Sequence, residues 1–176
     1  MMIQRVAVLL ALSLIVGCAD QAAIDALQKD LDSLRNRVAE GKVERTKYGD
    51  GSPLFMLVSA RLAADEHTLS MLEQKGAALR WYPKFTYTVD GQKWNPPADA
   101  EVQLRTAVEE LKVAQESADR ARAEAASKGG LIGILATLNA EVMRLPVAQL
   151  EYQVMALRHS FPVYAMPRVP TKDLVK

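Results

Sequence analysis

The chain has 176 residues, with 22 lysines and arginines against 21 aspartates and glutamates, so its formal net charge is +1. This balance argues against a nucleic-acid partner, which needs a basic face. Aromatic residues make up only 6% of the chain, and the composition favours a helical fold over a β-sandwich.

The first residues have the pattern of an export signal. Arg5 precedes an apolar run over residues 6–16, which is too short to cross a bilayer comfortably. The run ends at Ile15-Val16-Gly17-Cys18, which resembles the lipobox of bacterial lipoproteins. The resemblance implies that residues 1–17 are a cleaved signal peptide and that Cys18 carries the lipid.

The resemblance to lipoproteins also implies a location. It places the chain in the bacterial cell envelope with acyl chains such as palmitate on Cys18, and several chains together give lasting membrane attachment. Ala19 follows the cysteine, which implies the periplasmic face of the outer membrane. Cys18 is the only cysteine, so its lipidation would leave neither a thiolate nucleophile nor a cysteine metal site.

Residues 18–41 are expected to hold the anchor and a short helix that ends at Gly41. Its apolar residues recur in steps of three and four, as in a coiled-coil seam, at Ile24, Leu27, Leu31, Leu34 and Val38. In this register Asp30 and Arg35 would face opposite charges on a parallel neighbour. Two alternatives stay open: the seam packs inside its own chain, or it holds a homo-oligomer together.

After a polar connector, Ser52-Pro53 gives a cap residue followed by a proline at the first helical position. The spacing predicts a helix over residues 53–80, although residues 54–58 also fit a buried strand. Residues 84–94 then predict a small β-hairpin, because Asp90-Gly91 is suited to a two-residue turn. The expected pairs are Val89 with Gln92 and Tyr87 with Trp94.

The hairpin region contains the densest group of aromatic residues in the sequence. Its members include Trp81, Tyr82, Phe85, Tyr87 and Trp94. One hypothesis is that Trp81, Tyr82, Tyr87 and Trp94 bind a ligand or partner together with Arg80 and Arg158, which both lie near predicted helix ends. The alternative is that the aromatic residues attach the hairpin to the end of a helical bundle.

Two further helices are predicted, over residues 99–128 and 131–160. The first has an apolar stripe whose second half consists of alanines, at Leu104, Val108, Leu111, Ala114, Ala118, Ala121 and Ala125. Gly129-Gly130 is expected to end this helix. The second has an apolar stripe at Leu131, Leu135, Leu138, Val142 and Leu145, and Pro146 is expected to break or kink it. Residues 167–176 are expected to form a flexible tail.

The two halves of the mature chain resemble each other at an offset of 78 residues. Leu72-Glu73 matches Leu150-Glu151, and residues 78–80 match residues 156–158 as Ala-Leu-Arg. A duplication or chance in a leucine- and alanine-rich chain would both explain this. The resulting prediction is a mainly α fold, an elongated bundle of two helix-turn-helix units over residues 42–166 with the aromatic hairpin at one end.

The sequence offers little for catalysis. His67 and His159 have no metal-ligand spacing, and no G-x-S-x-G motif is present. We therefore expect no enzyme activity, cofactor or metal. The first hypothesis is an envelope lipoprotein that serves as a membrane-anchored scaffold or interaction module for a protein partner. The second is a periplasmic ligand-binding lipoprotein that uses the aromatic hairpin region.

Overall fold

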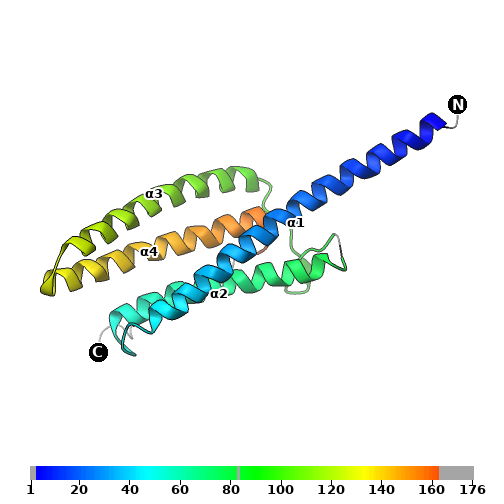
Figure 1. Ribbon diagram of the computed structural model, residues 1–176. Helices are drawn as coiled ribbons and strands as arrows, with labels where there is room; N and C mark the ends of the chain where they lie inside the picture. Colours follow the sequence, from blue (N-terminus) through cyan, green and yellow to red (C-terminus); the bar gives the residue numbers. More distant parts are fainter. Residues whose placement is uncertain (1–2, 83, 163–176) are drawn as a thin grey trace.

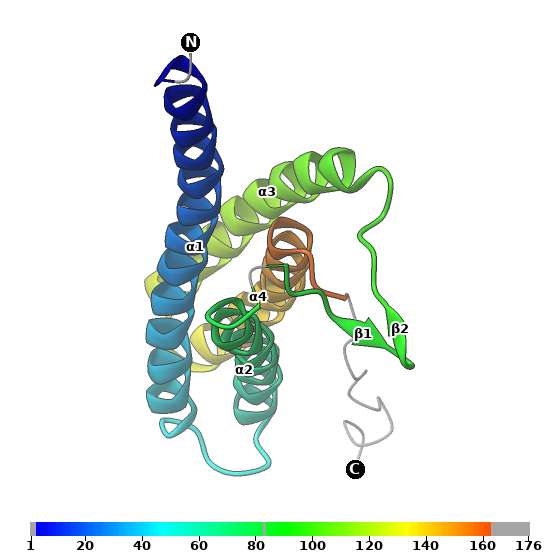
Figure 2. The same ribbon diagram turned by 90° about the vertical axis from the view of Figure 1, so that its right-hand side faces the viewer.

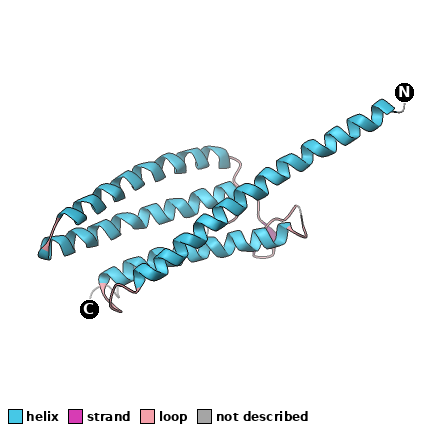
Figure 3. Ribbon diagram, viewed as in Figure 1, coloured by secondary structure: helices cyan, strands magenta, loops and turns pink. Residues whose placement is uncertain are grey.

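The computed structural model describes residues 3–82 and 84–162, with side chains described from Gln21 onward. The side chain of Cys18 and the tail at residues 167–176 therefore lie outside the described part. Within the described residues the chain is mainly α: α1 spans Ile3–Arg45, α2 Pro53–Leu79, α3 Ala100–Ser127 and α4 Gly130–His159 (Figures 1 and 3). This confirms the predicted fold class.

The helices form two hairpin pairs, α1 with α2 and α3 with α4, and α2 also packs on α4. The α1–α2 turn and the α3–α4 turn lie at the same end of the molecule, while the amino terminus of α1 projects from the opposite end (Figure 1). The predicted arrangement of two helix-turn-helix units is confirmed, and a duplication in the sequence remains a prediction.

The local signals at the start of α2 and at the hairpin act as expected. The Ser52 hydroxyl accepts a hydrogen bond from the Phe55 amide at 3.2 Å, so α2 begins with a side-chain cap and the strand alternative for residues 54–58 is wrong. Strands β1 (Thr88–Val89) and β2 (Gln92–Lys93) pair antiparallel in the predicted register, with Val89 opposite Gln92. The small hairpin stands beside the helices (Figure 2).

The turn of this hairpin shows why its sequence was informative. Asp90 and Gly91 both have positive φ, at 50° and 77°, as a type I′ turn requires. Beyond the two strands, the Trp94 amide donates to the Tyr87 carbonyl at 2.9 Å, in the register predicted for that pair.

The expected end of the first helix at Gly41 is wrong, because α1 continues to Arg45. Gly41 is buried in the helix, and a Cβ added there would lie 3.1 Å from Leu62 Cδ1. The missing side chain therefore lets α1 approach α2 closely.

The apolar seam of α1 packs inside the chain. Leu27, Leu31, Leu34 and Val38 are buried, whereas Ile24 is 44% exposed. The first three join the main core, whose other buried members are Met71, Leu72, Tyr87, Tyr152, Ala156 and Phe161. The structure thus places four of the five seam residues in an intramolecular interface, so they do not form a free oligomerisation seam.

The charges beside the seam are also used within the chain. Arg35 pairs with Glu73 of α2 at 3.0 Å, and Asp30 pairs with Arg158 of α4 at 3.0 Å. From the sequence, Asp30 and Arg35 could also have paired with charges on a second, parallel copy of the helix. In the structure both pair with residues of their own chain.

The expected break of α4 at Pro146 is wrong, because the helix runs without interruption from Gly130 to His159. A kink at this proline stays a prediction. The apolar stripe predicted for this helix lies largely on the outside, with Leu131 72% exposed, Leu135 58% and Val142 44%, while Leu138 and Leu145 are half-buried.

Small residues explain why the α4 stripe lies outside. Apart from Glu141, the buried positions in the first two thirds of α4 are Gly133, Ala140 and Ala148. Helix α3 likewise buries Ala107, Ala118 and Ala121, while Val108 of its predicted stripe is exposed. Facing alanines allow two helices to approach closely along their length. Along the first two thirds of α4, the α3–α4 pair therefore packs largely through small residues and leaves large aliphatic side chains outside. Nearer the end of α4, Leu104 and Leu111 of α3 pack with Val154 and Leu157.

Candidate functional site

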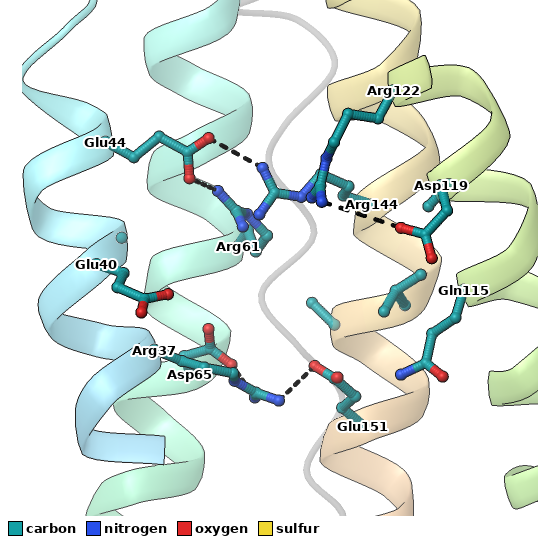
Figure 4. Close-up of a pocket in the computed structure, with 14 residues that line it drawn as sticks. Arg37, Glu40, Glu44, Arg61, Asp65, Gln115, Asp119, Arg122, Arg144 and Glu151 are labelled. Carbon is teal, nitrogen blue, oxygen red and sulfur yellow. Dashed lines mark hydrogen bonds and ion pairs between the residues drawn. The ribbon is translucent and has the colours of Figure 1, made fainter. Parts of the chain in front are cut away.

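A polar cleft lies between the two helix pairs, and side chains from all four helices line it (Figure 4). Its volume is about 330 Å³. The polar lining residues, which we call the ionic cleft, are Arg37, Glu40, Glu44, Arg61, Asp65, Gln115, Asp119, Arg122, Arg144 and Glu151. None of them was singled out from the sequence.

At one end of the ionic cleft, Arg37 of α1 joins three helices. Its Nη2 donates to the Asp65 carboxylate of α2, and its Nη1 lies 2.7 Å from Glu151 Oε2 of α4 (Figure 4). The Nε of Arg37 is buried and has no hydrogen-bond partner among the described residues. The position of this guanidinium is therefore set by the two carboxylates on either side of it.

At the other end of the ionic cleft, Glu44 of α1 also joins three helices, here through a carboxylate that binds arginines. Arg61 of α2 donates to its Oε2, and Arg144 Nη1 of α4 lies 2.9 Å from its Oε1 (Figure 4). Arg144 Nη1 also lies 2.7 Å from Glu141 Oε1, and the second oxygen of Glu141 is 3.8 Å from Arg61. Four charged groups thus form one connected cluster.

Burial sets the electrostatics of the ionic cleft. It raises the pKa of Glu141, and the nearby Arg61 guanidinium offsets this only in part. Burial likewise raises the pKa of Glu151, against the opposing effect of Arg37. Both carboxylates are therefore partly desolvated, and each depends on its arginine to stay charged at low cost.

The cleft has the chemistry of a joint between helices. The carboxylates of Glu44, Asp65 and Glu151 are each engaged by a guanidinium, so much of its charge is compensated internally. Among the described residues, no group of three or more histidines, cysteines or acids is placed to hold a metal ion. We therefore interpret the ionic cleft as a set of ion pairs that holds one helix pair in place against the other.

The sequence carried a weak signal for this cleft. Arg61 and Asp65 lie on the same face of α2 as the buried residues Val58 and Leu62, since Arg61 follows Val58 by three positions and Asp65 follows Leu62 by three. Charged residues on a core-facing stripe predict buried partners, and the partners themselves come from helices far away in sequence.

A second polar contact ties α1 to the end of α4. His159 is buried, with its Nε2 2.7 Å from Asp30 Oδ2, and its carbonyl accepts a hydrogen bond from Lys75 Nζ of α2. Burial lowers the pKa of His159, and the hydrogen bond with Asp30 opposes this shift. His159 lies at the helix end where the sequence placed it, but its partner was not foreseen.

The aromatic residues proposed as a binding group take separate positions. Tyr87 is buried and donates from its hydroxyl to the Met71 carbonyl at 2.5 Å, and burial raises the pKa of Tyr87 to about 12. Trp81 and Tyr82 are 81% and 69% exposed. Trp94 lines a hollow of about 390 Å³ with residues of α3 and α4, among them Leu157.

The two arginines proposed with these aromatic residues also face different parts of the molecule. Arg158 is exposed and pairs with Asp30. Arg80 lines a groove between α1 and α2, beside Ile24 and Glu73. Tyr87 thus follows the alternative in which an aromatic residue attaches the hairpin to the helices, and of the six proposed residues only Trp94 lines the hollow.

The most prominent feature outside the ionic cleft is an aliphatic surface on the first half of α4. It contains the five stripe residues Leu131, Leu135, Leu138, Val142 and Leu145, which we call the α4 stripe. Leu138 and Leu145 are half-buried and the other three are exposed, as are the flanking Ile132 and Ile134, at 66% and 62%. By length and composition α4 is apolar enough to cross a membrane, although the same test is passed by helices of soluble proteins. Exposed aliphatic residues gathered on one face mark a surface for contact with another molecule.

Comparisons of this chain with protein-family models, with curated proteins and with solved structures each gave no match.

Proposed function

We propose that this chain is a non-catalytic, lipid-anchored protein of the bacterial cell envelope that acts as a membrane-held scaffold or interaction module. The observation that carries the interaction role is the α4 stripe, in which Leu131, Leu135 and Val142 are exposed while Leu138 and Leu145 are half-buried. The location rests on the residues that end in Gly17-Cys18 and on their resemblance to a lipobox.

The geometry supports this arrangement. The amino terminus of α1 projects from one end of the molecule, and the turn that begins α4 lies at the other (Figure 1). An anchor at Cys18 would place the beginning of α4, and with it the start of the α4 stripe, at the end of the molecule far from the membrane. The ionic cleft is largely occupied by its own ion pairs, which supports a scaffold more than a catalyst.

The lipid anchor is tested by replacing Cys18 with serine in the full-length chain. We expect the parent protein to incorporate radioactive palmitate and to lose residues 1–17, and the Cys18→Ser variant to do neither, because a hydroxyl cannot form the thioether. An Ala19→Ser variant, altered at the next residue, should behave like the parent. Equal labelling of the parent and Cys18→Ser, or none in either, would refute the anchor.

A second candidate function is ligand binding at the hollow beside Trp94. This hollow has uncharged walls, made by Trp94, Asn95, Pro97, Gln103, Gln153, Leu157 and Phe161. Such walls suit a small, uncharged, largely apolar molecule with one or two hydrogen-bonding groups.

The ligand hypothesis is tested with the uncharged fluorescent dye N-phenyl-1-naphthylamine. In a Trp81→Phe variant, Trp94 is the only remaining tryptophan, so binding in the hollow should give energy transfer from Trp94 to the dye. A Leu157→Gln substitution should weaken this transfer severalfold by making a wall polar. Transfer that is absent, or unaffected by Leu157→Gln, would exclude the hollow as the site.

A further inference from the structure

We infer that the α4 stripe is the contact surface for a second copy of this chain, with the two α4 helices side by side and parallel. This deepens the proposed function, since the parallel orientation rests on two copies being anchored in the same membrane. The stripe itself is a property of the described fold and does not depend on the anchor.

The spacing of the stripe is the first argument. Leu131, Leu135, Leu138, Val142 and Leu145 follow one another by steps of four, three, four and three. This is the heptad seam by which one helix packs into another, with leucine at every d position and Leu135 and Val142 at a. A parallel copy would place each of these residues beside its own counterpart.

Charge is the second argument. From residue 130 to 143 the only charged residue is Glu141, which is buried and bonded to Arg144 of the same helix. Two copies of this face therefore meet without like-charge repulsion. The flanking positions at Ile132, Ile134 and Asn139 are uncharged as well, so the surface has no complement for a strongly acidic or basic partner.

Area is the third argument. The exposed parts of the stripe and its flanking isoleucines amount to several hundred Å² on each copy, roughly the largest apolar patch a monomer shows. This is below the ~800 Å² per partner of a standard stable interface. The pair is thus expected to be weak in dilute solution and to be favoured when both copies are held on one membrane, which raises their effective concentration.

Orientation follows from the fold. The α4 helix begins at the end of the molecule opposite to the amino terminus of α1 (Figure 1). Two copies anchored through Cys18 in one membrane stand with both α4 helices running in the same direction. An antiparallel pair would instead put the two amino termini at opposite ends.

The test is disulfide cross-linking of the full-length chain in its native membranes. Single cysteines are introduced as Leu131→Cys, Leu135→Cys or Leu138→Cys, and the chain with Cys18 alone gives the baseline. We expect each stripe variant to form a disulfide-linked dimer at least several times above that baseline. A Val113→Cys variant, on α3 and 63% exposed, is the matched control and should stay at the baseline.

Two results would overturn the inference. The first is that the stripe variants cross-link no more than Val113→Cys does. This result is expected if a bilayer or an unrelated protein covers the stripe. The other is a disulfide between co-expressed Leu135→Cys and Leu138→Cys chains that exceeds the disulfides within each, since only an antiparallel pair places these two positions opposite each other.

A second measurement does not depend on introduced cysteines. Sedimentation of the purified full-length chain in mild detergent, followed up to high protein concentration because the pair is weak, should show a dimer. Leu131→Gln with Leu135→Gln should weaken this dimer by about tenfold or more, since two exposed leucines leave the contact. Both side chains are exposed, so the helical circular dichroism should not change. A dimer that persists in this double variant would contradict the inference.

The outcome is distinguishable from that of the proposed function. Palmitate labelling without stripe cross-links would leave the anchor standing and remove the pair. Conversely, the chain could carry no palmitate and still form a dimer in detergent that is lost in the Gln double variant. This result would support the stripe as a contact between copies, and it would refute the anchor and with it the reason for a parallel orientation.

Discussion

Individual residues in this protein stabilise the fold through partners that are distant in sequence. Asp30 is an example, because the His159 ring and the Arg158 guanidinium both contact its carboxylate from the end of α4. Burial opposes the charged form of Asp30, yet these two hydrogen bonds outweigh it and lower the pKa of the carboxyl. Asp30 is therefore suited to remain a carboxylate in the folded protein.

The His159 contact predicts how stability depends on pH. Burial lowers the pKa of His159 below its usual value of 6.5, while Asp30 opposes and Lys75 and Arg158 reinforce the shift. The unfolded chain then binds a proton at a pH where the folded chain does not, so the His159 contribution to the free energy of unfolding is lost as pH falls below ~6.5.

The measurement is urea unfolding at several pH values between about 7.5 and 5.5. We expect His159→Gln to lose less stability on acidification than the parent chain. If His159→Gln and the parent respond to pH in the same way, His159 is not the titrating group.

At the scale of the element, α1 and α4 each carry a heptad-spaced stripe, but they use it differently. All of the α1 stripe except Ile24 is buried, mainly against α2 and the aromatic residues of the core, whereas three of the five residues of the α4 stripe are exposed and the other two are half-buried. The difference comes from the other faces: α4 has alanines and a glycine that fit closely against its neighbours, and α1 does not offer such a face over residues 24–38.

The α1 stripe is tested by shortening Leu34, which is 1% exposed. We expect Leu34→Ala to lower the free energy of unfolding by about 3 kcal/mol, through lost burial and the cavity left behind. The matched control is Ile24→Ala, in the same stripe but 44% exposed, which should cost less than ~1 kcal/mol. Equal and small effects in chemical unfolding would show that Leu34 is not in the core.

At the scale of the whole molecule, the ionic cleft connects the two helix pairs. Arg37 and Glu44 on α1 each bind partners on both α2 and α4, so these two charged side chains connect the helix pairs across the cleft. Partly buried ion pairs are costly to break from one side, because the group left behind is desolvated and unpaired.

We therefore predict that Arg37→Leu destabilises the protein by about 2–3 kcal/mol, because Asp65 and Glu151 lose their guanidinium. Adding Asp65→Asn and Glu151→Gln should restore part of this loss by removing the stranded charges. Lys42→Leu is the control, since its ion pair with Glu66 is exposed and should contribute less than ~0.5 kcal/mol. A thermal or urea midpoint unchanged in Arg37→Leu would contradict a joining role for the cleft.

The sequence by itself determined the elements and their ends wherever the signal was local. The Ser52-Pro53 start of α2, the Asp90-Gly91 turn and the Gly129-Gly130 break between α3 and α4 depend on backbone geometry within a few residues. The heptad spacing of residues 24–38 predicted a packed helix face, but it could not name the surface that covers it.

The tertiary structure alone decided which faces are covered. Periodicity shows that α4 has an apolar stripe, yet large aliphatic side chains were turned outward because alanine faces let α3 and α4 pack more closely. The ionic cleft could not be predicted from the sequence either, because its charged residues become partners only when α1, α2 and α4 pack together. Whether a helix face is buried depends on the element that packs against it, whereas the periodicity of a segment describes only the faces of that segment.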